Sequence, residues 1–122
     1  HAVEAETEPL LALDAGWRMT SGLKPVTTEV RDLFRRPLLG DELKKFDAIV
    51  IDPPRAGAEA QMLEIAESDV PLLAAVSCNP ATFARDAKNL VSKGFQLDWI
   101  QVVDQFRWST HVELVAKLSR TR

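Results

Sequence analysis

The hydrophobic residues of the chain gather into short runs, and polar stretches with helical spacing separate these runs. Near-continuous apolar runs, of the kind that buried parallel strands show, predict strands at 46–52 and 70–78. Two further runs predict strands at 95–104 and 111–119. Since no helix separates these two, we expect the last pair to be antiparallel. Residues 1–3 are typical of the tail of another strand.

Three stretches between these runs have the pattern of helices. Apolar residues at helical spacing predict one helix over 7–20 and another over 57–68. A third is expected over 80–94, with Asn79 as its cap and Pro80 in its first position. The segments left over predict a β-rich stretch at 25–30, a turn or short helix at 31–36, and a loop at 38–42.

The order of these elements favours the α/β class. Strands and helices alternate along the chain, which predicts a mostly parallel sheet that ends in an antiparallel hairpin. Ligands of such sheets bind at the carboxyl ends of the strands. Asp52 and Cys78 end consecutive predicted strands, so we expect them to face the same crevice.

Composition narrows the class of protein and its surroundings. The chain has 122 residues, 46% hydrophobic and 27% charged, which suits a folded domain. No apolar run approaches the ~20 residues of a membrane span, so we expect no membrane partner. A single cysteine forms no internal disulfide and cannot build a zinc site alone. We therefore expect no metal and a reducing, cytoplasmic setting.

Charge gives no overall sign of nucleic-acid binding. The net charge is −3, without the basic footprint that such a domain usually has. Arg31, Arg35 and Arg36 form a local basic cluster, and its simplest interpretation is a solvated surface.

Cys78 is the only cysteine, and two interpretations are open for it. Most lone cysteines are small buried hydrophobes. Cys78 lies, however, at a predicted strand end and directly before the helix start at Asn79-Pro80. The unpaired amides and the dipole of a helix start favour a thiolate, and a thiolate in a crevice is a nucleophile.

Asp52 opens the sequence Asp-Pro-Pro-Arg. Two prolines end a strand, so the plain interpretation is a loop exit. The functional one is a rigid loop in which Asp52 binds a polar ligand. Asp-Pro-Pro followed by an aromatic residue is typical of methyltransferases that act on amino groups, and Arg55 in the aromatic position weakens that interpretation.

Two further acids are candidates. His111 and Glu113 are two residues apart in a predicted strand and would share one face, where Glu113 could serve as a general base. The alternative is the solvent-facing side of an edge strand. Glu4 ends the first predicted strand, where an acid binds ribose hydroxyls in nucleotide-binding folds, and Glu6 competes for that role.

Taken together, Asp-Pro-Pro-Arg-Ala-Gly, Ser-Cys-Asn-Pro-Ala-Thr-Phe-Ala-Arg-Asp and the closing segment at 103–113 resemble the RNA uracil-5-methyltransferases. These are S-adenosylmethionine enzymes that make 5-methyluridine in ribosomal and transfer RNA. The resemblance implies a Rossmann-like class I methyltransferase sheet truncated on its N-terminal side. Residues 1–122 would be the C-terminal portion of the catalytic domain, without the upstream glycine-rich cofactor loop and RNA-binding region.

The resemblance also implies roles for single residues. Cys78 would be the nucleophile and Glu113 the base. Glu4 would hold the ribose of S-adenosylmethionine, and Asp32 would approach its adenine. Asp52 would lie at the site of the cofactor and the target base. The expected partner is ribosomal or transfer RNA, bound through the longer parent protein, and no metal takes part.

One departure and two alternatives stay open. The family's Asp-Met-Phe-Pro-His-Thr is here Asp-Gln-Phe-Arg-Trp-Ser, in which Trp108 could stack on a base or simply pack. The alternatives are a methyltransferase acting on an amino group and a non-catalytic module that binds RNA or cofactor. We expect the isolated chain to be inactive. The lack of a central strand would leave an unpaired sheet edge, which invites self-association.

Overall fold

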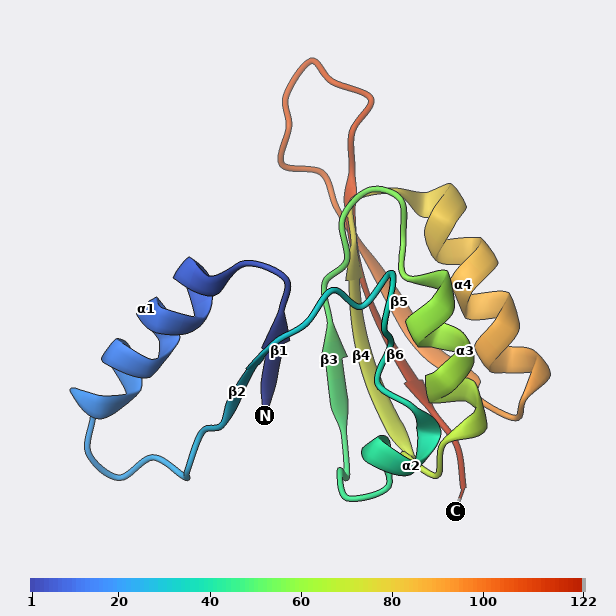
Figure 1. Ribbon diagram of the computed structural model, residues 1–122. Coiled ribbons are helices and arrows are strands. Elements are labelled where there is room, and N and C mark those ends of the chain that lie inside the picture. Colours follow the sequence, from blue (N-terminus) through green and yellow to red (C-terminus); the bar gives the residue numbers. More distant parts are fainter. Residues whose placement is uncertain (122) are drawn as a thin grey trace. The chain divides into compact units, whose positions relative to one another are not determined.

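The computed structural model describes residues 1–121, and the chain divides into two compact units at Pro37 and Leu38 (Figure 1). The first unit contains β1, α1 and β2, and the second contains the remaining elements in the order α2, β3, α3, β4, α4, β5, β6. Every strand predicted from the hydrophobic pattern is present, so the α/β class is confirmed.

The first unit is one strand–helix–strand turn of the chain. Strand β1 (Ala2–Glu4) lies parallel to β2 (Thr28–Val30), and α1 (Thr7–Arg18) connects them. The side chain of Trp17 anchors the returning chain, because its Nε1 donates a hydrogen bond to the carbonyl of Lys24 at 3.0 Å. The predicted helix and the β-rich stretch are thus confirmed, each shorter than the pattern indicated.

A turn follows β2, and it corrects one expectation. The amide of Arg36 donates to the carbonyl of Asp32 at 2.9 Å, which closes the turn. The side chain of Arg31 is only 10% exposed, and its Nη2 donates to the carbonyl of Pro37 at 2.6 Å. The interpretation of all three arginines as a solvated surface is therefore wrong for Arg31, which holds this turn together.

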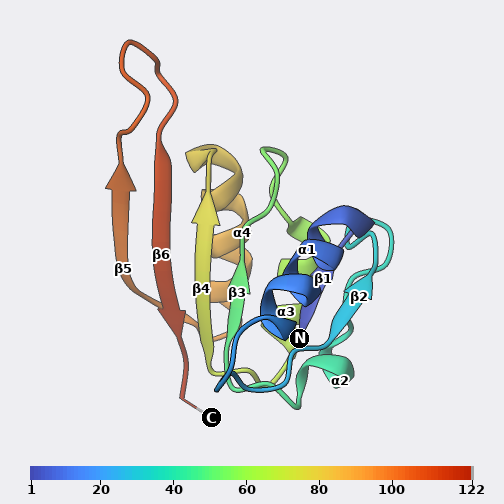
Figure 2. The ribbon, with the colours of Figure 1, turned by 90° about the vertical axis from the view of Figure 1, so that its left-hand side faces the viewer.

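The second unit has one four-stranded sheet (Figure 2). In spatial order its strands are β3 (Ile49–Ile51), β4 (Leu72–Ser77), β6 (Glu113–Ser119) and β5 (Gln96–Val103). Strand β3 is parallel to β4, and β6 is antiparallel to both of its neighbours. The antiparallel final pair is confirmed. Because β6 has a neighbour on each side, the edge-strand interpretation of its start is wrong.

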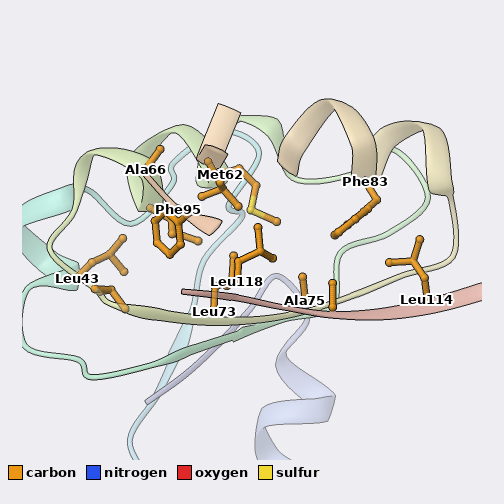
Figure 3. Close-up of a cluster of buried hydrophobic side chains, with 13 residues drawn as sticks. Leu43, Met62, Ala66, Leu73, Ala75, Phe83, Phe95, Leu114 and Leu118 are labelled. Atoms are coloured by element: carbon orange, nitrogen blue, oxygen red, sulfur yellow. The ribbon is translucent and has the colours of Figure 1, made fainter. Parts of the chain in front are cut away.

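Helices α3 (Glu59–Glu67) and α4 (Pro80–Ser92) lie side by side on one face of this sheet (Figures 1 and 3). Asn79 caps α4 as expected, since its Oδ1 accepts the amide of Ala81 at 3.1 Å. The expected loop at 38–42 is wrong, because α2 (Gly40–Leu43) forms there. The carboxylate of Glu42 accepts the amide of Leu39 at 2.9 Å, and this bond satisfies a backbone donor at the start of so short a helix.

The core lies between the sheet and these two helices (Figure 3). Residues alternate along the strands, so that one set is buried against the helices and the other faces away. The buried set on the strands comprises Leu73, Ala75 and Ser77 of β4 and Leu114, Ala116 and Leu118 of β6. The intervening residues of β4 are only half-buried, and Val50 of β3 is 77% exposed.

Arg120 ties the end of β6 to the end of α3. Its guanidinium lies 4.4 Å from the ring centre of Phe95 and donates to the carbonyls of Ala66 at 3.0 Å and Val70 at 3.2 Å. Burial lowers the pKa of Arg120. A cation at the carboxyl end of a helix satisfies carbonyl groups that the helix itself leaves open, so this contact stabilises the far end of the layer.

Candidate active site

The two candidate residues of the parallel strands leave the sheet at the same end. Asp52 follows Ile51, the last residue of β3, and is exposed. Cys78 follows Ser77, the last residue of β4, and is a partly exposed free thiol. Because β3 and β4 are parallel, both residues come at the carboxyl edge, where ligands of such sheets bind.

The antiparallel ladder brings Glu113 to the same end. The last pair between β4 and β6 is Ser77 with Leu114, so the next residues of the two chains are Cys78 and Glu113. Directly opposed residues of an antiparallel pair have Cβ atoms about 4.5–5.5 Å apart. Leu114 faces the core, so the alternation along β6 assigns Glu113 to the opposite face, whereas Cys78 lies in the bend that follows β4.

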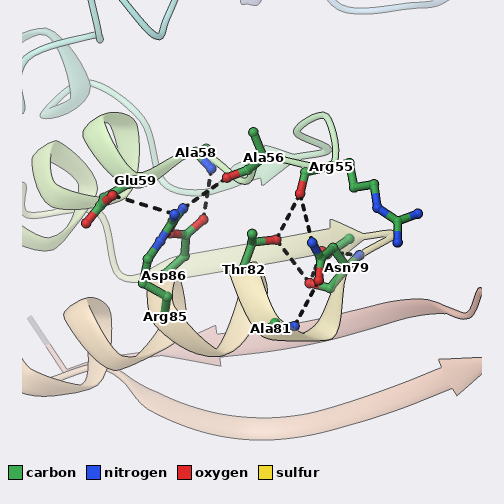
Figure 4. Close-up of polar contacts among 10 residues, drawn as sticks. Arg55, Ala56, Ala58, Glu59, Asn79, Ala81, Thr82, Arg85 and Asp86 are labelled. Carbon is green, nitrogen blue, oxygen red and sulfur yellow. Dashed lines mark hydrogen bonds and ion pairs between the residues drawn. The ribbon is translucent and has the colours of Figure 1, made fainter.

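The turn that carries Cys78 is closed by its neighbours. The hydroxyl of Ser77 accepts the amide of Asn79 and donates to its carbonyl, both at 3.1 Å. The Nδ2 of Asn79 then donates to the carbonyl of Arg55 at 3.1 Å, and the hydroxyl of Thr82 donates to the same carbonyl at 3.2 Å (Figure 4). The Asp-Pro-Pro-Arg loop is thus fixed to the Cys78 turn by its backbone.

At Gly57 the Asp-Pro-Pro-Arg loop lies close against α4. Its φ is +81°, and a Cβ at this position would lie 2.7 Å from both Nη2 of Arg85 and Oδ2 of Asp86. Asp86 is 1% exposed, accepts the amide of Ala58 at 2.8 Å, and accepts a second bond from Arg85 at 2.7 Å (Figure 4). This hydrogen bond raises the pKa of Arg85. The glycine of the first motif and the Arg-Asp of the second are therefore parts of one contact.

The side chain of Arg55 reaches the third motif. Its Nη1 lies 2.8 Å from Nδ1 of His111. A guanidinium only donates hydrogen bonds, so Nδ1 of His111 is the acceptor and the neutral ring carries its proton on Nε2. Arg55 therefore joins three segments: its own loop, the Cys78 turn through its carbonyl, and the segment before β6 through its side chain.

Sequence reasoning missed this position of Arg55 and misplaced His111. Strand β6 begins at Glu113, so His111 precedes the strand and does not share a strand face with Glu113. Arg55 and His111 are 56 residues apart, and no spacing in the sequence indicates their contact. The only available signal was that their motifs occur together.

The two candidate cofactor residues of the first unit have local contacts. Glu4 ends β1, and its Oε1 accepts the amides of Ala5 at 2.7 Å and Glu6 at 3.4 Å. Asp32 follows β2, and its Oδ1 accepts the amides of Phe34 at 2.9 Å and Arg35 at 3.3 Å. Glu4 is thus an exposed acid at the carboxyl end of a parallel strand, and Asp32 organises a turn.

Within residues 1–121, no group of three or more His, Cys, Asp or Glu side chains could hold a metal ion. No helix of the described chain is long and apolar enough to cross a membrane.

Comparison with known proteins identifies the family. The family model described as tRNA (uracil-5-)-methyltransferase matches residues 18–121. The chain belongs to the tRNA (uracil-5-)-methyltransferase family. An uncharacterized RNA methyltransferase of Mesorhizobium japonicum is 57% identical to this chain. The match covers all of this chain and 30% of the Mesorhizobium protein. A 23S rRNA (uracil(1939)-C(5))-methyltransferase of Colwellia psychrerythraea is 46% identical over 62% of the chain and 16% of its own length.

Solved structures agree with this assignment. A Pyrococcus abyssi tRNA (uracil-54, C5)-methyltransferase, determined with S-adenosyl-L-homocysteine, is 32% identical with a TM-score of 0.68. The match covers 96% of the present chain and 28% of the Pyrococcus protein. A putative methyltransferase of Thermoplasma acidophilum shares the fold, with a TM-score of 0.65 at 14% identity, and the match covers 98% of the chain and 56% of that protein. The chain spans less than a third of the length of the curated relatives that it matches along its full length.

Proposed function

We propose that the parent protein transfers a methyl group from S-adenosylmethionine to C5 of a uridine in ribosomal or transfer RNA. The observation that carries the proposal is the ladder register, in which Cys78 and Glu113 follow the last pair of β4 and β6. A thiol and a carboxylate that come together at this edge of the sheet, where ligands bind, would suit such a transfer. Family membership supports the reaction class.

The chemistry assigns one task to each of these residues. The Cys78 thiolate adds to C6 of the uracil, and the displaced electron pair makes C5 nucleophilic. S-adenosylmethionine supplies the methyl group that ends on C5. The carboxylate of Glu113 then takes the proton from C5, the C5–C6 double bond re-forms, and Cys78 leaves as the thiolate. A base inside a helix cannot be reached in this way, so the target uridine must leave its stack.

Three acidic residues of the chain are suited to bind parts of S-adenosylmethionine. Glu4 and Asp52 are exposed carboxylates directly at the ends of parallel strands, each in its own unit, and carboxylates there bind ribose hydroxyls or an amino group. We assign the ribose to Glu4 and the region of the cofactor and target base to Asp52. We predict that Asp32 lies near the adenine. In the structure its carboxylate accepts the amide of Phe34 within its own turn.

Two properties of the chain itself remain predictions. Residues 1–122 would be the C-terminal portion of a catalytic domain and inactive alone. The chain would self-associate through β3, whose only partner among the described strands is β4. The reducing cytoplasm proposed for the parent protein would keep Cys78 as a thiol.

The proposal is tested with the full-length protein, S-adenosylmethionine labelled in its methyl group, and an RNA pool lacking 5-methyluridine. Nucleosides from the digested RNA are separated and identified by mass. Labelled 5-methyluridine is the expected product. Label on an exocyclic amino group would instead support the alternative methyltransferase, and cofactor binding without transfer to RNA would support the non-catalytic module.

A further inference from the structure

The loop between β5 and β6 projects beyond the sheet at the end where β3 and β4 finish (Figures 1 and 2). Its tip carries Phe106, Arg107 and Trp108. Trp108 is 104% exposed, so the alternative in which it packs against the protein is wrong. Phe106 beside it is 44% exposed. A large aromatic side chain held entirely in solvent is a typical feature of a binding surface.

The backbone holds Trp108 in this place. Its φ is +63°, and no other residue of the described chain except glycine has a positive φ. Residues other than glycine adopt this conformation at an energetic cost, and such positions cluster at ligand-binding sites. The amide of Ser109 donates to the carbonyl of Phe106 at 3.2 Å, and the amide of His111 donates to the hydroxyl of Ser109 at 3.1 Å. The tip is therefore a closed turn.

The same hairpin carries the proposed base. Val103 of β5 pairs with Glu113 of β6, and this pair closes the loop at its foot. His111, next to the foot, is held by Arg55. The aromatic tip and the carboxylate of Glu113 are thus parts of one short hairpin, and a substrate bound at the tip would be aligned with the site.

The chemistry of the tip matches single-stranded RNA. Unpaired bases stack on aromatic side chains and on arginine, and arginine also contacts phosphate. The chain as a whole has a net charge of −3, so attraction to RNA has to come from local groups such as Arg107. A target uridine that leaves its stack also requires neighbouring bases without firm pairing.

We infer that Trp108 stacks on an unpaired base beside the target uridine and that Arg107 contacts a phosphate of the same strand. The inference rests on the proposed function and names the part of the chain that selects unpaired RNA. It assigns these residues to binding and leaves the chemical step to Cys78 and Glu113.

The test uses the full-length protein and a fluorescently labelled short oligouridylate, with binding followed by anisotropy. Replacing Trp108→Ala should raise the Kd roughly 5- to 150-fold, the effect of losing one base–aromatic stack. Trp108→Phe should retain most of the affinity because it keeps an aromatic face. The matched control is Trp99→Phe on β5 of the same hairpin, which should bind as the wild type does. Arg107→Gln should reduce the salt dependence of binding.

Three outcomes would overturn the inference. Trp108→Ala could bind oligouridylate as tightly as the wild type, or no more weakly than Trp99→Phe. Trp108→Ala could also abolish a self-association seen in sedimentation, which would make the tip a protein contact. An unaltered salt dependence of binding in Arg107→Gln would contradict the contact between Arg107 and phosphate. This result would count even if Trp108→Ala failed to fold. Failure of the proposed function is distinguishable, because it appears as absence of 5-methyluridine in the wild type.

Discussion

Ser77 of β4 pairs with Leu114 of β6, and this pair is the last one before the two chains separate at the end of the sheet. Both side chains are buried, and the next residues beyond this pair are Cys78, in the bend after β4, and Glu113, the first residue of β6. A thiol and a carboxylate that are 35 residues apart in the sequence therefore come to the same end of the sheet. The antiparallel return of β6 between β4 and β5 makes this possible.

Glu113→Gln should stop the reaction after the methyl group has reached C5. The amide cannot take the proton, so the covalent link from Cys78 to C6 persists. We expect 5-methyluridine formation to fall about 10²- to 10⁴-fold, and a protein–RNA complex to accumulate on a denaturing gel with ordinary uridine RNA. A slow variant without such a complex would show that Glu113 acts before or outside proton removal.

Arg55→Lys should reduce turnover without weakening RNA binding. Lysine keeps the backbone carbonyl that holds Asn79 but loses the fork that reaches His111 at 2.8 Å. A small displacement near the reacting groups costs up to about 100-fold in rate, which bounds the expected loss in kcat. His111→Asn, which keeps an acceptor, should be more active than His111→Ala. If Arg55→Lys raises KM and leaves kcat unchanged, Arg55 binds RNA instead of positioning the segment before β6.

Gly57→Ala should destabilise the protein. The added Cβ would meet Arg85 and Asp86 at 2.7 Å, at a φ of +81° that costs roughly 1–2 kcal/mol for alanine even without a clash. Urea unfolding measures the free-energy change. Gly16→Ala in α1 is the matched control, because nothing lies within 4 Å of its Cβ and alanine favours a helix by about 0.5–1 kcal/mol. Equal effects of the two changes would contradict the close contact at Gly57.

Asp98 should make the second unit sensitive to acid. Hydrogen bonds from Lys117 and then from Ser119 lower the pKa of Asp98 from its ordinary value of 3.8. A lowered folded pKa stabilises the fold above the ordinary value, and this contribution is lost as pH falls through the folded value. Asp98→Asn should therefore lower Tm at neutral pH and reduce the loss of Tm below about pH 4. Asp104→Asn, in the exposed hairpin loop, should leave the profile unchanged; a similar change there would remove Asp98 as the cause.

The local pattern predicted the elements well because burial and helix capping act over a few residues. The runs at 70–78 and 111–119 became β4 and β6, and Asn79 caps α4 as expected. The short helix at Gly40 was missed, because its support comes from Glu42 bonding back to Leu39 and from packing against α3. The sequence gives no sign of the contact between Gly40 and Glu64, which lies 24 residues away, and Leu39 is not a usual capping residue.

The candidate site was predictable in its residues and not in its connections. The motifs named Cys78, Asp52 and Glu113, and the strand ends brought them to one edge. The contact of Arg55 with His111 depends on tertiary structure over 56 residues, which no periodicity encodes. The register of β4 with β6 likewise depends on the burial of alternate residues on both strands at once.

The most direct measurement of the central claim is a covalent trap. RNA containing 5-fluorouridine and S-adenosylmethionine are mixed with the full-length wild type, with Cys78→Ala and with Glu113→Gln, and each mixture is run on a denaturing gel. Fluorine at C5 cannot leave as a proton does, so the wild type and Glu113→Gln should both retain a protein–RNA adduct, and Cys78→Ala should retain none. An adduct of wild-type amount in Cys78→Ala, or none in a wild type that makes 5-methyluridine, would contradict the assignment of Cys78 as the nucleophile.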